Sequence, residues 1–423
     1  MFTSFSTALS ALNATSTAID VVGNNLANMN TPGFKTSELC FRDLVTESLG
    51  AGLGTTQVGF GTGQPLTIRE FTQGAIQTSA GLMDAAIQGT GFFVTTDSSG
   101  NTFYTRAGNF TTNTSGNLVT DTGNYVQGWT TIDPATGQVD TNGPIGNIVV
   151  PVGTLKPPTV TTTITDDLNL NSSAAGDATS NFTTPVTVYD SLGNTHVLTL
   201  TFQKTTQANQ WSYDVTLPGA DVTGGTAGTP FDISGASGTL TFDANGDLTD
   251  PTVGSPINLS ITGLTDGASD MNLSWNLYNS NGSGRITQFS QASASSASSQ
   301  NGAGAAQLVS VGLADGGGIL AQYSDGQQVT VGQVAVASIR NPETLIAVGS
   351  NAFQLSQLTA TPAIGVPGTG GRGTIQGGSL EASTVDIATE FTNLIVYQRG
   401  YEANAHVITT ADQLSQDTIN LIH

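Results

Sequence analysis

A glycine-rich segment near the C-terminal end is the first place where residue types and spacing could support chemistry. Gly368-Thr-Gly-Gly-Arg-Gly373 matches G-x-G-x-x-G, a pattern that brings backbone amides against nucleotide phosphates. The pattern works between a β-strand and a helix of a βαβ unit, and no clear β-strand leads into it here. We therefore predict a flexible linker that returns to a C-terminal helix, not a nucleotide site.

A second candidate, Asp243-Ala-Asn245-Gly-Asp247, resembles the start of a calcium-binding loop. An EF-hand loop needs glycine at its sixth position and glutamate at its twelfth. Here the glycine is fourth and no glutamate stands at the twelfth position. The segment is better explained as the turn of a β-hairpin.

Histidine and cysteine are too sparse to suggest a metal centre or a catalytic triad. His196, His406 and His423 are far apart, and no G-x-S-x-G motif is present. The single cysteine, Cys40, excludes an intrachain disulfide and a cluster of thiolate ligands, and we interpret it as a small apolar filler. We expect no catalytic, cofactor-binding or metal-binding residues, and hence no enzyme.

The three tryptophans leave two interpretations open. Trp129, Trp211 and Trp275 could stack on sugars, as in a secreted glycan-binding or glycan-cleaving β protein. Packing in a core or an interface is the interpretation we favour, because indole rings bury large apolar areas.

The charge balance excludes several classes of partner. The 423 residues include 31 acidic residues against 10 lysines and arginines, for a formal net charge of -21. Such a surface repels nucleic-acid backbones and anionic membranes. No apolar run is long enough to span a bilayer. The first basic residue is Lys35, so the positive segment of a signal peptide is missing, and we expect export by a route that reads no cleaved signal.

The N-terminal segment predicts one helix of about 25 to 28 residues. Its apolar positions recur at intervals of three and four, and the Asn30-Thr31-Pro32-Gly33 turn ends it. The stripe consists of Phe5, Ala8, Leu12, Thr15, Ile19, Val22, Leu26 and Met29.

The C-terminal segment predicts a second helix, running almost to His423. Ser383-Thr-Val-Asp386 has the form of a capping box at its start. Two apolar stripes lie side by side, so the helix has a broad apolar face that touches more than one neighbour. The first stripe holds Ile387, Phe391, Leu394, Tyr401, Ala405, Ile408, Ile419 and Ile422, and the second holds Val407, Leu414 and Leu421.

Between the helices, short Thr/Val/Ile/Tyr/Phe runs alternate with turn sequences, the pattern of antiparallel hairpins. A short helical piece is expected at Ser37 to Leu49, and a Ser/Ala/Gly-rich joint at Ser290 to Ala306. The fold class is therefore α+β, mostly β, with long terminal helices that pair as a coiled coil and two β-rich domains, one inserted into the other. The expected divisions are a terminal helical domain (1–30 and 384–423), an irregular connector (31–70 and 366–383), a β-rich inner domain (71–149 and 287–365) and an inserted β-rich outer domain (150–286).

The paired helices also predict assembly. A two-helix hairpin held away from the β core is marginal by itself, because ordering its backbone costs more than its apolar side chains return. Neighbouring subunits are the natural source of the missing contacts, so we predict termini that are disordered in the monomer and fold on polymerisation. The alternative, in which the helices pack on the β region of their own chain, stays open.

Motifs at both ends resemble the bacterial flagellar axial proteins of the rod and hook. The N-terminal signature includes Val22-Gly-Asn-Asn-Leu-Ala-Asn-Met-Asn-Thr-Pro-Gly-Phe-Lys35, and the C-terminal one includes Gly378-Ser-Leu-Glu-Ala-Ser-Thr-Val-Asp386 followed by Tyr397-Gln-Arg-Gly-Tyr-Glu-Ala-Asn404. Further matches, such as Ile87-Gln-Gly-Thr-Gly-Phe-Phe-Val94, cover the middle. The signature positions are Asn24, Asn25, Leu26, Ala27, Asn28, Thr31, Pro32, Gly33, Phe34, Gln398, Arg399 and Tyr401.

The resemblance implies a subunit of a helical tube whose channel is lined by the terminal helices. An insertion of about 137 residues points to the hook member of the family, a curved flexible joint that transmits torque; a distal-rod or hook-filament junction protein is the alternative. The implied partners are further copies of the chain, the distal rod protein, the hook cap, the junction proteins and the flagellar export apparatus. The implied location is the flagellar hook outside the cell. Intersubunit packing is expected from Phe5, Leu12, Ile19, Val22, Leu26, Met29, Ile387, Phe391, Leu394, Tyr401, Ala405, Ile408 and Leu414.

Overall fold

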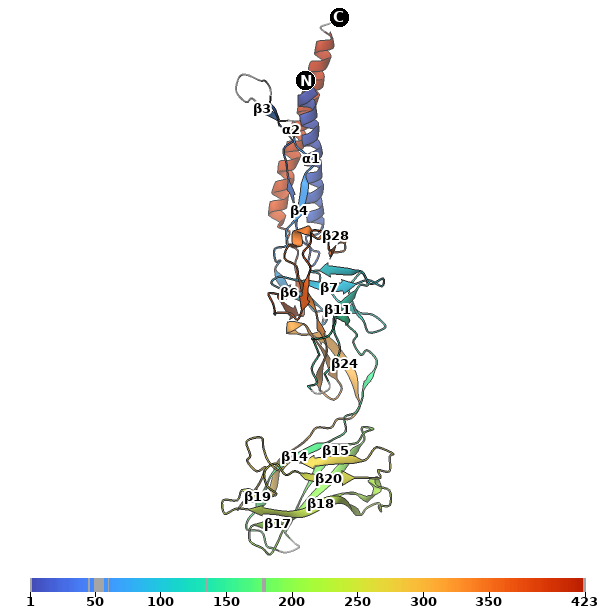
Figure 1. The fold of residues 1–423 in the computed structure, drawn as a ribbon, viewed down its shortest axis with the longest axis vertical. Helices are drawn as coiled ribbons and strands as arrows, with labels where there is room; N and C mark the ends of the chain where they lie inside the picture. Colours follow the sequence, from blue (N-terminus) through green and yellow to red (C-terminus); the bar gives the residue numbers. More distant parts are fainter. Residues whose placement is uncertain are drawn as a thin grey trace. The chain divides into compact units, whose positions relative to one another are not determined.

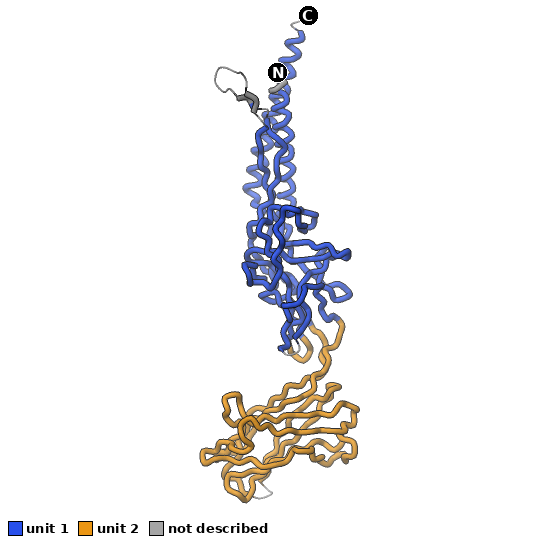
Figure 2. Tube along the Cα trace, viewed as in Figure 1, with its two compact units in different colours: residues 1–152, 310–322, 328–423 blue, residues 153–309, 323–327 orange. Residues whose placement is uncertain are grey.

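The chain folds into two compact units in a computed structural model that describes residues 2–44, 46–48, 57–59, 61–133, 136–176 and 180–420. Unit 1 comprises Met1–Val152, Ser310–Gln322 and Gln328–His423, and unit 2 comprises Gly153–Val309 and Tyr323–Gln327 (Figure 2). One unit is therefore inserted into the chain of the other.

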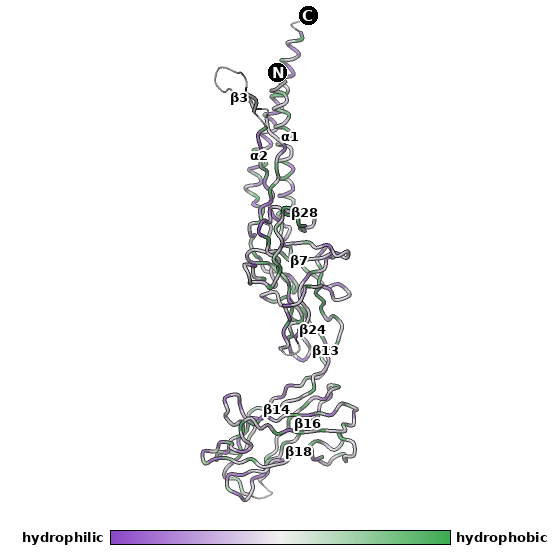
Figure 3. The backbone as a smooth tube through the Cα atoms, viewed as in Figure 1, coloured by the Kyte–Doolittle hydropathy of each residue, from purple (hydrophilic) through white to green (hydrophobic). Residues whose placement is uncertain are grey.

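Two long helices form one end of unit 1. They are α1 (Phe2–Ala27) and α2 (Ile387–Asn420), and they lie side by side with the two chain ends at the same side of unit 1 (Figure 1). The predicted pairing of terminal helices is confirmed. Hydrophilic and hydrophobic residues are interspersed along both helices (Figure 3), and no helix in the described part of the chain is long and apolar enough to cross a membrane.

The rest of unit 1 consists of short strands. In its largest sheet β24, β25, β26, β11, β7, β8, β29 and β28 follow one another, and smaller two-stranded ladders join β1 to β4, β2 to β3, β31 to β6 and β32 to β5. The strands before the insertion are β1 (Ser37–Cys40), β2 (Thr46–Ser48), β3 (Gln57–Gly59), β4 (Leu66–Arg69), β5 (Ile76–Thr78), β6 (Ala85–Gln88), β7 (Phe92–Thr96), β8 (Thr102–Thr105), β9 (Thr111–Thr112), β10 (Leu118–Val119), β11 (Tyr125–Trp129) and β12 (Gly146–Asn147). The elements after it are β24 (Ala306–Leu313), η2 (Asp315–Gly317), β25 (Gly318–Tyr323), β26 (Gln328–Val334), β27 (Val336–Ser338), η3 (Pro342–Thr344), β28 (Ile346–Gly349), β29 (Ala352–Gln354), β30 (Ala363–Gly365), β31 (Thr374–Gly377) and β32 (Ser379–Glu381).

Unit 2 is built around a sheet in the order β15, β16, β17, β18, β20, β21, β14, β22. Buried and exposed residues alternate along its long strands, as the two faces of a strand require, and the buried face forms one core around Phe202, Trp211 and Trp275. Its elements are β13 (Leu155–Lys156), β14 (Thr163–Asn171), β15 (Asn181–Tyr189), β16 (Thr195–Lys204), β17 (Gln210–Pro218), η1 (Gly219–Asp221), β18 (Pro230–Phe242), β19 (Leu248–Asp250), β20 (Ile257–Ile261), β21 (Met271–Trp275), β22 (Ile286–Phe289) and β23 (Ala294–Gln300).

The expected end of the insertion, at residue 286, differs from the structure. β22 pairs in parallel with β14 and β23 pairs with β14 in antiparallel fashion, so both strands complete the sheet of unit 2. Residues 287–309 therefore belong to unit 2 and not to the inner domain, and the Ser/Ala/Gly-rich segment contains a strand. Ladder hydrogen bonds to a neighbouring strand, which composition does not reveal, decide this boundary.

Predictions for the connector after α1 also need correction. The helical piece expected at Ser37 to Leu49 is wrong: β1 forms an antiparallel ladder with β4, and β2 pairs with β3. Cys40 lies on the β1–β4 ladder with its side chain exposed, so it is not an apolar filler. The glycines at 50, 52 and 54, expected to make the connector irregular, lie outside the described residues.

Candidate assembly surface of the helix pair

The seam between the helices is built from small side chains of α1. An added Cβ at Gly400 of α2 would lie 3.7 Å from Thr15 Cγ2 of α1, an ordinary van der Waals distance, so the Thr15 side chain lies close to α2 at this point. The buried apolar side chains of α1 are Ala8, Ala14, Ala18 and Val22.

A buried polar pair joins the helices near their base. Asn25 Nδ2 on α1 donates to Glu390 Oε1 on α2 at 2.9 Å, and also to the Ser37 carbonyl oxygen at 2.9 Å. The Ser37 amide donates to Asn25 Oδ1 at 3.1 Å. Because a buried amide of this kind is satisfied in only one alignment, Asn25 sets the register of α1 against both α2 and β1.

The turn after α1 depends on glycine. Gly33 has a φ of 71°, and an added Cβ would lie 2.6 Å from the Ala107 amide nitrogen. Its own amide donates to the Glu381 carbonyl oxygen at 2.8 Å, and Asn351 Nδ2 donates to the Pro32 carbonyl oxygen at 2.9 Å. The predicted turn thus docks the end of α1 onto the β structure of unit 1.

Glu381 binds two buried cations beside this turn. Its Oε1 lies 2.6 Å from Lys35 Nζ and accepts a hydrogen bond from the Gly74 amide at 2.8 Å, while its Oε2 lies 3.3 Å from an Arg106 guanidinium nitrogen. Burial lowers the pKa of Lys35 and of Arg106, against the opposing effect of the Glu381 charge. Three parts of the chain, after α1, after β8 and before α2, are thereby held together. This cluster was not predicted from the sequence, although Lys35 and Glu381 stand inside the two terminal motifs.

Helix α2 begins one turn later than the predicted cap implies. Asp386 caps it, because its Oδ1 accepts from the Thr389 amide at 2.9 Å and its carbonyl accepts from the Glu390 amide. Ser383 was expected in this role, but its hydroxyl only accepts a 3.4 Å contact from the Val385 amide. The acid expected at the third helical position is the cap itself.

The residues expected to pack between subunits differ in exposure: seven of the thirteen are buried or half-buried, and six are exposed. Val22 is buried in the seam, Leu12, Ile19, Leu26, Leu394, Ala405 and Ile408 are half-buried, and Phe5, Met29, Ile387, Phe391, Tyr401 and Leu414 are exposed, the last at 60%. Of the other stripe members, Leu421 and Ile422 lie outside the described residues. The helix pair thus leaves large apolar side chains uncovered on its outer faces.

The signature residues divide between structure and surface. The buried members, where α1 meets the β structure of unit 1, are Asn25, Gly33 and Phe34. The half-buried members are Leu26, Asn28, Thr31 and Pro32, and the exposed members are Asn24, Ala27, Gln398, Arg399 and Tyr401. The buried members build the base of the helix pair. The exposed members have no comparable role in the described part of a single chain.

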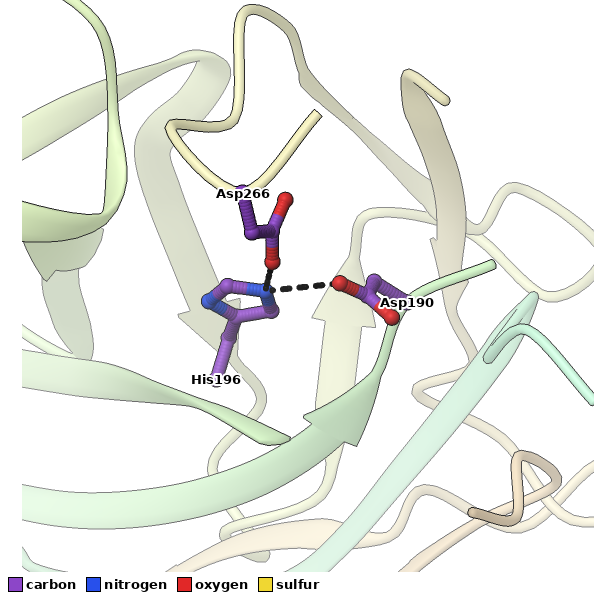
Figure 4. A group of neighbouring side chains, drawn as sticks. All are labelled: Asp190, His196 and Asp266. Atoms are coloured by element: carbon purple, nitrogen blue, oxygen red, sulfur yellow. Dashed lines mark hydrogen bonds and ion pairs between the residues drawn. The ribbon is translucent and has the colours of Figure 1, made fainter. Parts of the chain in front are cut away.

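A histidine in unit 2 has several charged partners (Figure 4). His196 Nε2 lies 3.4 Å from both Asp190 Oδ2 and Asp266 Oδ2, and Nδ1 lies 3.0 Å from Asp221 Oδ2. Burial by itself would lower the pKa of His196, but hydrogen bonds to Asp221 and Asp190 outweigh it and raise the pKa. One nitrogen and two carboxylates at such distances have the composition of a metal site. Because both ring nitrogens face carboxylates, we interpret the group as an imidazolium that joins three turns.

The remaining motifs have structural roles. Asp243 Oδ1 accepts from the Asn245 and Asp247 amides at 2.8 Å and 2.9 Å, which makes the predicted hairpin turn between β18 and β19. The Gly368–Gly373 loop lies between strands β30 and β31, outside any βαβ unit. Trp129, Trp211 and Trp275 are 6%, 0% and 0% exposed, so they pack in cores and present no ring to a sugar.

Comparison with known proteins decides the family. Four family models match: "Flagella basal body rod protein" at residues 5–35, "Flagellar hook protein FlgE/F/G D1 domain" at 86–165, "Flagellar basal body protein FlaE D2 domain" at 159–303 and "Flagellar basal body rod FlgEFG protein C-terminal" at 376–421. The flagellar hook protein FlgE of Escherichia coli K12 is 36% identical over 430 residues, covering 99% of both chains. This chain belongs to the flagellar hook protein family.

More distant relatives agree with that assignment. The hook protein of Borreliella burgdorferi is 32% identical and covers 100% of both chains. The crystal structure of a Helicobacter pylori hook protein, FlgE2, covers 71% of this chain and 99% of its own with a TM-score of 0.51 and 15% identity, a likeness of fold. The predicted role as a structural subunit of the hook is confirmed, as is the mostly β fold with terminal helices.

Proposed function

We propose that copies of this chain polymerise through the outer faces of α1 and α2 into a curved, flexible tube that transmits torque from the rod to the filament. The observation that carries the proposal is the set of large apolar side chains left exposed on the helix pair. Phe391 is 52% exposed, Leu414 and Ile419 are each 60% exposed, and Leu9 is 45% exposed. Burying each such side chain contributes about 1.5–3 kcal/mol.

The proposed arrangement places the terminal helices, residues 1–30 and 384–423, around the central channel and the inserted unit outermost. Two compact units joined by separate chain passages suit a tube that bends while it turns, because each unit keeps its own core. A label on the surface of unit 2 is expected along the whole hook, which a rod or junction location would not produce.

The finer partners are proposals of the same kind. The chain would meet the distal rod protein at one end of the hook and the hook cap and junction proteins at the other. It would reach the outside of the cell unfolded, through the flagellar export apparatus and without a cleaved signal. We further propose that it has no enzymatic activity and that α1 and α2 become ordered only on polymerisation.

Substitutions on the exposed helix face test the proposal. The double variant Phe391→Ser with Leu414→Ser is expected to abolish polymerisation, measured by sedimentation and electron microscopy, while the circular dichroism of the β structure stays unchanged. Gln413→Ser, an exposed polar position on the same helix, is the matched control and is expected to polymerise normally. Polymerisation of the double variant at the wild-type critical concentration would refute the role of this face.

Hydrogen exchange tests the ordering step separately. Amides of α1 and α2 are expected to exchange quickly in a dilute monomer and slowly in the polymer. Equal protection of helices and β core in the monomer would contradict it.

A further inference from the structure

An acidic pocket lies at the base of the helix pair. It has a volume of about 340 Å³ and is lined by residues of α1, β1, the end of β4 and the first turns of α2. Four of its lining residues are acids, Glu38, Glu70, Asp386 and Glu390, and among the described residues that line it none is basic. Carboxylates gathered around one cavity attract a cation.

Glu390 is the member of this group that indicates a missing partner. Glu390 is 5% exposed, and its Oε1 accepts a hydrogen bond from Asn25 Nδ2. The other oxygen, Oε2, is buried and has no hydrogen-bond partner among the residues that the structure describes. Burial raises the pKa of Glu390, and the charges of Glu38 and Asp386 raise it further, against the hydrogen bond from Asn25. A buried, half-satisfied carboxyl facing other carboxyls suits a cationic hydrogen-bond donor.

Cations are scarce in this chain, and several are already engaged. Of its 10 basic residues, Lys35 and Arg106 bind Glu381, Lys156 lies 3.1 Å from Asp325, and Arg285 lies 2.8 Å from Asp167. Arg42, Arg340 and Arg399 are exposed, and of these three Arg399 is the one on helix α2. Its guanidinium is 80% exposed, and its ion pair within the described part of the chain is a 3.4 Å contact with Glu402, itself 62% exposed. Such a surface pair contributes little and leaves the guanidinium available.

Arg399 cannot reach the pocket of its own chain. It lies nine residues after Glu390, or two and a half helical turns, so the two side chains point to opposite sides of α2 and are separated by about 14 Å along its axis. The side of α2 that carries Arg399 also carries Ile395 and Val396, each 58% exposed. A neighbouring helix pair that covers these apolar side chains would meet Arg399 at the same time.

We propose that the acidic pocket of Glu38, Glu70, Asp386 and Glu390 receives the Arg399 guanidinium of a second copy of this chain in the polymer. The inference rests on the proposed polymerisation. A guanidinium has five donors in a planar fork, enough to bind two of the carboxylates that line the pocket at once. The contact would align neighbouring subunits along the tube, because the apolar face alone permits sliding.

Charge-neutralising substitutions, made separately and combined, test the proposed contact between Arg399 and the acidic pocket. In full-length chain, Arg399→Gln and Glu38→Gln with Glu70→Gln are each expected to raise the critical concentration for polymerisation at least tenfold. The triple variant, which combines all three substitutions, is expected to have a critical concentration no higher than that of the more affected of these two variants. Arg42→Gln, an exposed arginine of the same unit, and Glu402→Gln, which removes only the partner of Arg399 within its own chain, are expected to leave the critical concentration within about twofold of the wild type.

Zero-length crosslinking then identifies the pair. Arg399→Lys keeps the charge and supplies an amine, so a carbodiimide is expected to link the amine at position 399 to Glu38, Glu70 or Asp386 between subunits in the polymer and not in the monomer. Wild-type chain that polymerises, together with an Arg399→Gln variant of unchanged critical concentration, would overturn the proposal. Polymerisation that depends on added Mg²⁺ or Ca²⁺, is lost with the Glu38 and Glu70 changes and is indifferent to Arg399 would also overturn it, in favour of an inorganic cation. Failure of wild-type chain to polymerise would instead count against the proposed function.

Discussion

Replacing Glu381 by glutamine is expected to destabilise unit 1 strongly. The side chains of Lys35, Arg106 and Glu381 are 0%, 5% and 0% exposed, so the charge of Glu381 is the compensation for two cations that cannot reach water. Breaking a buried ion pair by removing one partner costs about 3–5 kcal/mol. Glutamine keeps the size of the side chain, so the loss would report charge and not a cavity.

Urea unfolding gives the measurement, and unit 2 provides an internal reference. Trp129 reports on unit 1, and Trp211 and Trp275 report on unit 2, whose core Glu381 does not enter. The matched control is Glu402→Gln, the same chemical change in an exposed ion pair, expected to cost less than about 1 kcal/mol. If Glu381→Gln also lowered the unfolding free energy of unit 1 by less than about 1 kcal/mol, the ion pairs of Glu381 with Lys35 and Arg106 would not be what stabilises this part of unit 1.

Three further outcomes are expected. Gly33→Ala should destabilise unit 1 by at least about 1–2 kcal/mol because of its positive φ, with the close contact to Ala107 adding to this, as measured by thermal unfolding. Gly23→Ala, in open space on α1, should stabilise the helix slightly, as measured by thermal unfolding of the polymer, in which α1 is proposed to be ordered. Burial raises the pKa of Asp166 to about 6, and the charge of Asp167 adds to this, so folded unit 2 keeps the Asp166 proton to a higher pH than the unfolded chain does. The unfolding free energy of unit 2 should fall as pH rises between the ordinary pKa of 3.8 and about 6, and the fall should be absent in Asp166→Asn. The pKa of His196 is raised because the folded protein favours its charged form. Its contribution to the unfolding free energy of unit 2 should therefore be complete below pH 6.5 and be lost as the pH rises through the pKa of the folded state. His196→Gln should remove this dependence on pH.

The fold was predictable where a pattern is local. Apolar residues recurring at intervals of three and four predicted both helices, and the Asn30-Thr-Pro-Gly33 turn predicted the end of α1 within a few residues. Alternating β-rich runs and Asx turns such as Asp243–Asp247 found the hairpins. The boundary near residue 286 failed, because β22 and β23 are assigned by their pairing with β14, more than 100 residues earlier in the chain. The ion pair of Glu381 with Lys35 also joins residues far apart in the chain. In the sequence its one sign is that each residue is a charge in a motif with few charges.

The heptad stripe on α1 shows why spacing alone does not assign a partner. Ala8 and Val22 belong to the predicted stripe and are buried, but Phe5 and Met29 of the same stripe are exposed at 43% and 40%. Small residues such as Ala14 and Ala18, outside the stripe, are buried instead. The buried apolar positions of α1 hold alanine and valine, whereas its large side chains Phe5, Leu9 and Met29 are exposed. An apolar pattern that is wider than one helix can cover is therefore the sequence feature that most directly indicates further helices from other subunits.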